Sequence, residues 1–226
     1  MLIVPTILTT HLAEFERQFI RMLPWCKTFQ IDIQDGKYVP SSTLSVEDLY
    51  IFFSSADESK LNIFQTATFD FHLMELNYAN SIKTLRKLAP IIPIRYVFTH
   101  TNIDIESKLV SDLVVCPALS PEDAIDRYLL GSDIQTYPAI QVMTIHPGPQ
   151  GQIFMIGELD KVCSLRTFGF GGQIMIDGCV NDDSIKQMKG LPPSYLPDVL
   201  CVGSYFSKCP DESIQTQYTK LNQLIT

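Results

Sequence analysis

The sequence predicts a single (β/α)8 barrel over residues 1–226, and three observations favour this fold. Short apolar runs rich in β-branched residues alternate with segments of helical period, which is typical of repeated βα units around a parallel sheet. The chain has 226 residues, a length that such barrels use as one domain. Polar residues stand at the ends of several runs, where this fold places its active sites.

Apolar runs of strand length supply the eight strands of the barrel. In chain order they are Leu2–Leu8, Thr28–Ile33, Ala67–Leu73, Arg95–Thr99, Asp112–Cys116, Ile140–Ile145, Gln173–Ile176 and Val199–Val202. A doubly wound open sheet is the alternative fold for the same alternation.

Apolar residues at helical spacing predict the intervening helices. The clearest stripes are Leu12, Phe15, Phe19 and Met22; Tyr78, Ile82, Leu85 and Ala89; and Ile214, Tyr218, Leu221 and Ile225. Ser120–Asp123 is predicted to begin a helix that stops at Gly131, because a capping hydroxyl, a proline and two acidic residues follow one another. Only a turn or two of helix fits between His100 and Asp112, so the fourth helix of the barrel should be shortened.

The charge balance argues against a broad surface for nucleic acids or anionic membranes, because 17 basic residues stand against 25 acidic ones. A phosphate site in this chain would rely on backbone N–H groups and helix N-termini. The six cysteines form no CxxC pair and no zinc-finger spacing, which indicates reduced thiols. The N-terminus lacks a basic region and a long apolar run, so we expect a cytoplasmic protein without a signal peptide or a membrane span.

The second strand carries three polar residues on one face. Gln30, Asp32 and Gln34 alternate with apolar residues, and the apolar face must pack against helices, so the polar three should point into the barrel. A buried aspartate is costly unless it is paired or bound to a metal. The alternative is structural, with Asp32 capping the turn at Asp35–Gly36.

Two further strands also end on residues that can bind a metal. His72 ends the third strand and Asp177 ends the seventh, and each alone could be a core residue with satisfied hydrogen bonds. Together with Asp32 they form a ligand set suited to zinc, iron or manganese. Two carboxylates on opposite sides of a pocket also suit acid and base catalysis on the two faces of one carbon.

Glycine-bearing loops follow the last three strands, where barrels of this kind commonly bind phosphate. They are His146–Gln152, Asp177–Cys179 and Gly203–Ser204. A glycine after one strand is most often only a turn, but three such loops in succession favour a phosphate site.

Six motifs in this order resemble those of the ribulose-phosphate 3-epimerase family, and the resemblance covers nearly the whole chain. They are Pro5–Leu8, Ile31–Pro40, Phe71–Met74, Val142–Gly148, Ile176–Gly178 and Val202–Ser204. The resemblance implies a (β/α)8 barrel, a divalent metal, and interconversion of ribulose 5-phosphate and xylulose 5-phosphate, a reaction of the pentose phosphate pathway. A small phosphorylated sugar is then the expected partner, and a homo-oligomer is left open.

The resemblance also implies roles for individual residues. Asp32 and Asp177 would be the two acid/base groups, and both would bind the metal with His72. Thr6, His72, Met74 and Met143 would contact substrate. The phosphate would be held by the late loops, through Gly148, Pro149, Gln150, Gly151, Gly178, Cys179, Gly203 and Ser204.

Departures from the family pattern qualify these roles. Gln30 stands where the family has a histidine ligand, so it would be the fourth metal ligand through a weaker amide oxygen. Gln34 replaces a methionine, while Pro149, Gln150 and Cys179 replace aromatic or glycine residues. The alternatives are therefore an epimerase for a related ketose phosphate, such as allulose 6-phosphate, and a degenerate homologue that binds phosphosugars without turnover.

Overall fold

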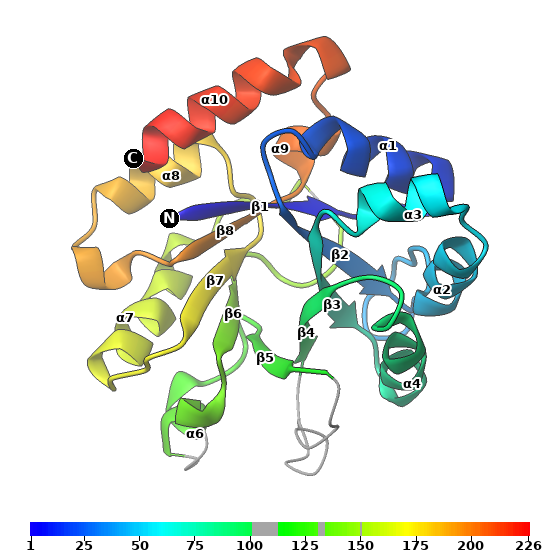
Figure 1. Ribbon diagram of the computed structural model, residues 1–226. Helices are drawn as coiled ribbons and strands as arrows, with labels where there is room; N and C mark the ends of the chain where they lie inside the picture. Colours follow the sequence, from blue (N-terminus) through cyan, green and yellow to red (C-terminus); the bar gives the residue numbers. More distant parts are fainter. Residues whose placement is uncertain (101–112, 131–133, 150) are drawn as a thin grey trace. The chain divides into compact units, whose positions relative to one another are not determined.

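The computed structural model describes residues 1–100, 113–130, 134–149 and 151–226. Eight parallel strands follow one another around a closed barrel in chain order (Figure 1). Their bounds are β1 Leu2–Ile7, β2 Thr28–Gln34, β3 Thr68–Met74, β4 Ile94–His100, β5 Val115–Leu119, β6 Ala139–Met143, β7 Gln173–Asp177 and β8 Val199–Val202. The predicted fold class is confirmed.

Helices lie between the strands wherever the structure describes the connecting segment, as the alternation predicts. In the described parts of the chain they are α1 Leu12–Met22, α2 Val46–Ser54, α3 Glu58–Phe64, α4 Ala79–Leu88, α6 Ile125–Leu130, α7 Leu159–Thr167, α8 Asp182–Lys189, α9 Ser204–Ser207 and α10 Ile214–Ile225. Among these helices, none is long and apolar enough to cross a membrane. All six cysteines are free thiols.

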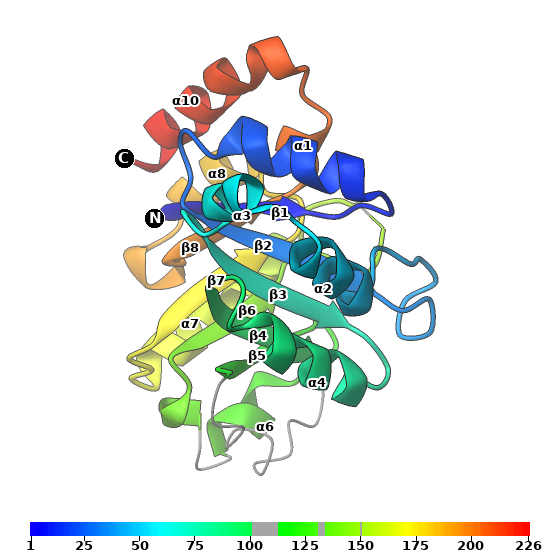
Figure 2. The ribbon, with the colours of Figure 1, turned by 45° about the vertical axis from the view of Figure 1, so that its right-hand side comes forward.

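By its internal contacts the chain divides into two compact units, residues 5–115 and residues 116–226 with 1–4. In the first unit, phenylalanines on three helices and two strands build the core outside the sheet. Figure 2 shows α1, α2 and α3 alongside β2 and β3. The ring centroids of Phe19 and Phe64 are 4.5 Å apart, and those of Phe19 and Phe29 are 4.7 Å apart. These buried rings hold the helices against the outer face of the strands, which leaves the opposite face of each strand to polar residues.

In the second unit, two lysines link helices to their surroundings. Buried Lys161 of α7 donates to the carbonyl oxygens of Ser120 and Pro121 at 2.8 and 3.0 Å, and to Glu158 at 2.5 Å. Lys220 of α10 pairs with Asp182 at the start of α8, and the two helices run side by side (Figure 1). Both contacts tie the outer helices to segments that border the strand ends.

The two largest boundary errors both concern the fifth βα unit, and the other strand bounds differ from the predicted ones by at most two residues. Ser120–Asp123 forms a turn and not the first turn of a helix, because the backbone N–H of Ser120 donates to the Asp123 carboxylate at 2.7 Å and the helix begins at Ile125. The fifth strand lies three residues later than predicted, at Val115–Leu119, since Ala118 and Leu119 pair with β6. The shortened fourth helix and the stop at Gly131 fall on residues outside those that the structure describes.

Candidate functional site

The parallel register of β2 and β3 places Asp32 directly opposite His72. The Nδ1 atom of His72 lies 3.3 Å from Oδ1 of Asp32. His72 is 0% exposed and Asp32 is 6% exposed, so both side chains are removed from bulk water. A carboxylate oxygen and an imidazole nitrogen side by side in a buried position are a donor pair that suits a divalent transition metal.

Gln30 and Gln34 flank Asp32 on the same face of β2, as the alternation predicts, and both are buried. The side-chain nitrogen of Gln30 donates to Oδ1 of Asp32 at 3.0 Å. Gln34 donates to the sulfur of Met74, its register partner on β3, at 3.6 Å. Gln30 therefore orients the Asp32 carboxylate, in addition to its predicted role as a ligand.

The turn after β2 is formed by Asp35, which answers the structural alternative for Asp32. The Asp35 carboxylate accepts hydrogen bonds from the backbone N–H groups of Lys37 and Tyr38, both at 2.8 Å, and from that of Leu76 at 2.9 Å. The Asp32 side chain contacts Gln30 and His72 instead. The turn after β2 is thus held by the carboxylate of Asp35 and not by that of Asp32.

Another buried carboxylate of this unit, that of Asp70, is held in a structural ion pair. Asp70 lies on β3 one pleat repeat before His72 and forms an ion pair with Arg95 of β4, whose Nε atom is 2.9 Å away. Burial raises the pKa of Asp70, while the Arg95 guanidinium acts to lower it. The two carboxylates differ in their partners, since Asp32 meets an amide and an imidazole and Asp70 meets a permanent cation.

His100 contacts His72 and was not predicted as a site residue. It ends β4, is 1% exposed, and its Nε2 atom lies 2.7 Å from Nε2 of His72. The Tyr38 ring stacks on it at 5.2 Å between centroids. Burial, and next the nearby His72, lower the pKa of His100 well below its usual value. A signal existed, because His100 follows Phe98, the register partner of His72, by one pleat repeat.

Thr6 lies beside Gln30 across the β1–β2 pairing. It is buried, and its hydroxyl has no hydrogen-bond partner among the described residues. A buried hydroxyl normally finds a partner, so this one suits a ligand contact.

Asp177 ends β7 in the second unit and is 8% exposed. The side-chain nitrogen of Gln141, on neighbouring β6, donates to its Oδ2 atom at 3.0 Å. Met143, a predicted substrate contact, is the register partner of Asp177 and is buried. Gln141 was not predicted as a site residue, although a polar residue inside the apolar run Ile140–Ile145 was a usable signal.

The loops after β6 and β7 are tied together at their start. The hydroxyl of Thr144 donates to the carbonyl oxygens of Asp177 at 3.1 Å and Gly178 at 2.6 Å. Gly178 has φ +121°, and a Cβ atom there would lie 2.9 Å from the backbone nitrogen of Ile145. Only glycine permits this close approach, which explains why glycine occupies position 178.

Other predicted phosphate-binding residues also lie in loops with unusual backbone. Gly148 has φ +133°, Gly151 has φ +96°, and Cys179 has φ +52°. Pro149 is exposed, and its carbonyl oxygen accepts from the Gln152 amide at 3.0 Å, while Gly203 directly precedes Ser204, the first residue of α9. Gln150 falls outside the described residues. The loops follow three neighbouring strands, because β6 pairs with β7 and β7 pairs with β8.

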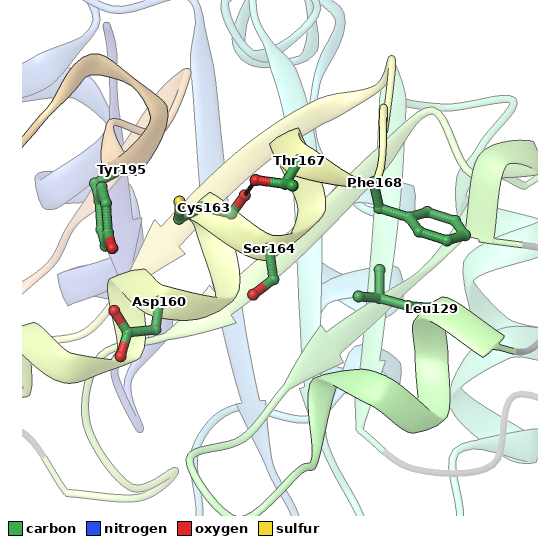
Figure 3. A pocket seen from close by; sticks show the side chains of 7 residues that line it. All are labelled: Leu129, Asp160, Cys163, Ser164, Thr167, Phe168 and Tyr195. Carbon is green, nitrogen blue, oxygen red and sulfur yellow. Dashed lines mark hydrogen bonds between the residues drawn. The ribbon is translucent and has the colours of Figure 1, made fainter.

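An open pocket of about 570 Å³ lies on the outer helices of the second unit (Figure 3). It is lined by Leu129, Asp160, Cys163, Ser164, Thr167, Phe168 and Tyr195. These residues belong to the helical layer and not to the strand ends. The candidate site is therefore defined by the strand-end residues and not by this pocket.

Comparison with known proteins agrees with the motifs. The model of the ribulose-phosphate 3 epimerase family matches residues 2–192. A ribulose-phosphate 3-epimerase of Schizosaccharomyces pombe is 28% identical over 167 residues, covering 73% of this chain and 70% of that protein. The enzyme of the same name from Helicobacter pylori is 23% identical over 223 residues, covering 95% and 94%.

Solved structures with little sequence identity share the fold. The 3-hexulose-6-phosphate synthase of Salmonella typhimurium has a TM-score of 0.65 at 11% identity and covers 99% of this chain and 98% of its own. Phosphoribosyl anthranilate isomerase of Thermus thermophilus has a TM-score of 0.64 at 10% identity, covering 99% and 100%. At these identities the likeness concerns the fold alone.

Proposed function

Because the chain belongs to the ribulose-phosphate 3-epimerase family, we propose that it is a sugar-phosphate 3-epimerase that interconverts ribulose 5-phosphate and xylulose 5-phosphate. The observation that carries the proposal is the pair of buried carboxylates at strand ends, Asp32 on β2 and Asp177 on β7. Each accepts a hydrogen bond from a glutamine amide, which fixes the orientation of the carboxylate. A protein that only binds sugars has no need of both.

The proposed chemistry is proton exchange at C3. The C3 proton of the substrate lies next to a ketone, so its removal gives an enediolate. One of the two aspartates removes the proton from one face, and the other returns a proton to the opposite face. The buried hydroxyl of Thr6, together with Met74 and Met143, would contact the substrate around this carbon.

We further propose that Asp32, His72 and Asp177 hold a divalent metal, either zinc, iron or manganese. All three are buried and each offers one ligand atom, and the mixed oxygen and nitrogen donors fit such an ion. Gln30 is the proposed fourth ligand. When bound, the metal would supply positive charge to the oxygens on which negative charge develops.

The phosphate group would be bound by the loops after β6, β7 and β8. Three residues there, Gly148, Gly151 and Gly178, have positive φ and no side chain, which lets backbone N–H groups approach an anion. Backbone N–H groups of Cys179, Gly203 and Ser204 would also contact the phosphate.

The test is an epimerisation assay with purified protein and ribulose 5-phosphate. We expect formation of xylulose 5-phosphate, loss of turnover in Asp32→Asn and in Asp177→Asn, and loss after treatment with a chelator. Asp160→Asn, a change at an exposed carboxylate on α7, is the matched control and should keep full activity. Near-normal turnover in either catalytic variant would refute the two-base mechanism.

The same assay separates the alternatives. Faster turnover of allulose 6-phosphate would assign the related ketose phosphate as substrate. Binding of ribulose 5-phosphate without turnover of either sugar would indicate the degenerate homologue.

A further inference from the structure

We propose that His100 is a positioning residue that fixes His72 so that its Nδ1 atom, and not Nε2, binds the metal. The proposal rests on the metal site of the proposed function. It concerns the choice between the two nitrogen atoms of one buried ring, which decides where the ion sits relative to Asp32.

The contacts of His72 separate its two nitrogens. Nε2 lies 2.7 Å from Nε2 of His100, a normal hydrogen-bond distance. Nδ1 lies 3.3 Å from Oδ1 of Asp32. Since Nε2 faces His100 and Nδ1 faces Asp32, Nδ1 is the nitrogen that can share an ion with Asp32.

The proton on each ring follows from these contacts. A neutral imidazole carries one proton, so metal binding at Nδ1 of His72 places the proton of His72 on Nε2. That N–H needs an acceptor, and Nε2 of His100 accepts it when the proton of His100 sits on its Nδ1 atom. Hydrogen bonds of this kind fix the ring and the tautomer of metal-binding histidines.

Without metal, the reverse arrangement satisfies the same groups. His100 then donates from Nε2 to Nε2 of His72, and Nδ1–H of His72 donates to Asp32. Each ring carries one proton in both states, so no net proton is gained or lost by the pair. Metal binding would therefore exchange the tautomers of both rings.

His100 itself is held firmly enough to serve this role. The ring of Tyr38 stacks on it with an angle of 25° between planes. The backbone N–H of Tyr38 donates to Asp35, which also accepts from Leu76. The loop after β2 thus holds the His100 ring in place through Tyr38, while Nε2 of the same ring contacts His72.

Metal titration of the metal-free protein provides the first test. His100→Phe keeps a ring but removes the acceptor, and should weaken zinc and manganese binding about 10- to 100-fold, as losses of such partners do. His100→Gln restores an acceptor and should recover most of the affinity. His11→Phe, at an exposed histidine before α1, is the control and should leave the affinity unchanged.

Nitrogen-15 NMR of the histidine rings provides a readout independent of activity. In the wild type we expect the proton of His72 on Nδ1 without metal and on Nε2 with zinc. Zinc bound at Nε2, or equal affinity in wild type and His100→Phe, would overturn the inference while leaving the proposed function in place. Failure of the wild type to bind any metal would refute the proposed metal site and this inference with it.

Discussion

Two glutamine amides, on β2 and on β6, each donate to one of the two aspartates proposed as acid/base groups. Gln30 donates to Asp32 and Gln141 donates to Asp177, each at 3.0 Å. The Oε1 atom of Gln141 is buried and has no hydrogen-bond partner within the described parts of the chain. The unsatisfied oxygen of Gln141 therefore lowers the stability of the fold. Its contact with Asp177 offers a functional explanation for a glutamine at this position.

Replacing Gln141 by leucine should separate activity from stability. A hydrogen bond to a charged group contributes about 1.5 to 3 kcal/mol, so loss of the donor to Asp177 should lower kcat/KM roughly 10- to 100-fold. The free energy of unfolding should change little, because removal of the unsatisfied buried oxygen offsets the loss of the hydrogen bond to Asp177. Epimerase kinetics and urea unfolding check both expectations, and an unchanged kcat/KM would contradict them.

Single residues were predictable where they depend on one strand alone. Alternation within β2 was enough to place Gln30, Asp32 and Gln34 on one buried face. His100 and Gln141 required knowledge of which residues face each other on neighbouring strands, and register is fixed by packing across the sheet. The predicted fourth strand also stopped at Thr99, one residue before His100.

At the scale of elements, the loops after β6 and β7 pack so closely that one position accepts only glycine. A Cβ atom on Gly178 would lie 2.5 Å from Cγ1 of Ile145, whereas one on Gly151 would have no heavy atom within 4 Å. Both glycines have positive φ, so alanine is strained at both positions.

The pair Gly178→Ala and Gly151→Ala isolates the cost of this close contact. We expect the first change to lower the free energy of unfolding by about 1 to 3 kcal/mol more than the second, as overpacking does. Urea unfolding of both variants measures the difference. Equal losses would mean that the backbone conformation, and not the approach of Ile145, makes glycine necessary.

We expect a similar contrast in stability between replacement of a buried lysine, Lys161, and replacement of an exposed one. Its ammonium group is buried between two carbonyl oxygens and Glu158, so Lys161→Met should cost about 3 to 5 kcal/mol, as removal of one partner of a buried ion pair does. Lys186 of α8 pairs with Asp183 in solvent, and Lys186→Met should cost less than about 0.5 kcal/mol. Thermal unfolding compares them, and a loss for Lys161→Met as small as that for Lys186→Met would show that the buried ammonium contributes little.

Element boundaries were predictable where propensity and packing agree. Val199–Val202 and the helix from Leu12 to Met22 have the predicted bounds, because their apolar patterns are unbroken. The fifth strand contains Pro117 and Ala118, which have weak strand propensity, and so the sequence places it too early. After Ser120, one of the acidic residues that favour a helix start, Asp123, closes a turn instead.

At the scale of the whole molecule, the closed order of eight parallel strands and the family match together support an epimerase. The strand order was predictable from the alternation of runs, since it needs no side-chain detail. The proposed arrangement of metal, sugar and phosphate around Asp32 and Asp177 depends on the folded chain, so the alternation of runs alone could not predict it.

Solvent hydrogen exchange at C3 tests the two-base epimerisation most directly. Purified protein should be incubated with ribulose 5-phosphate in heavy water, and the product examined by NMR for deuterium. We expect xylulose 5-phosphate with deuterium at C3, because one aspartate removes the original proton and the other delivers one from solvent. Product that retains the original hydrogen at C3, or no product from metal-loaded protein, would contradict this mechanism.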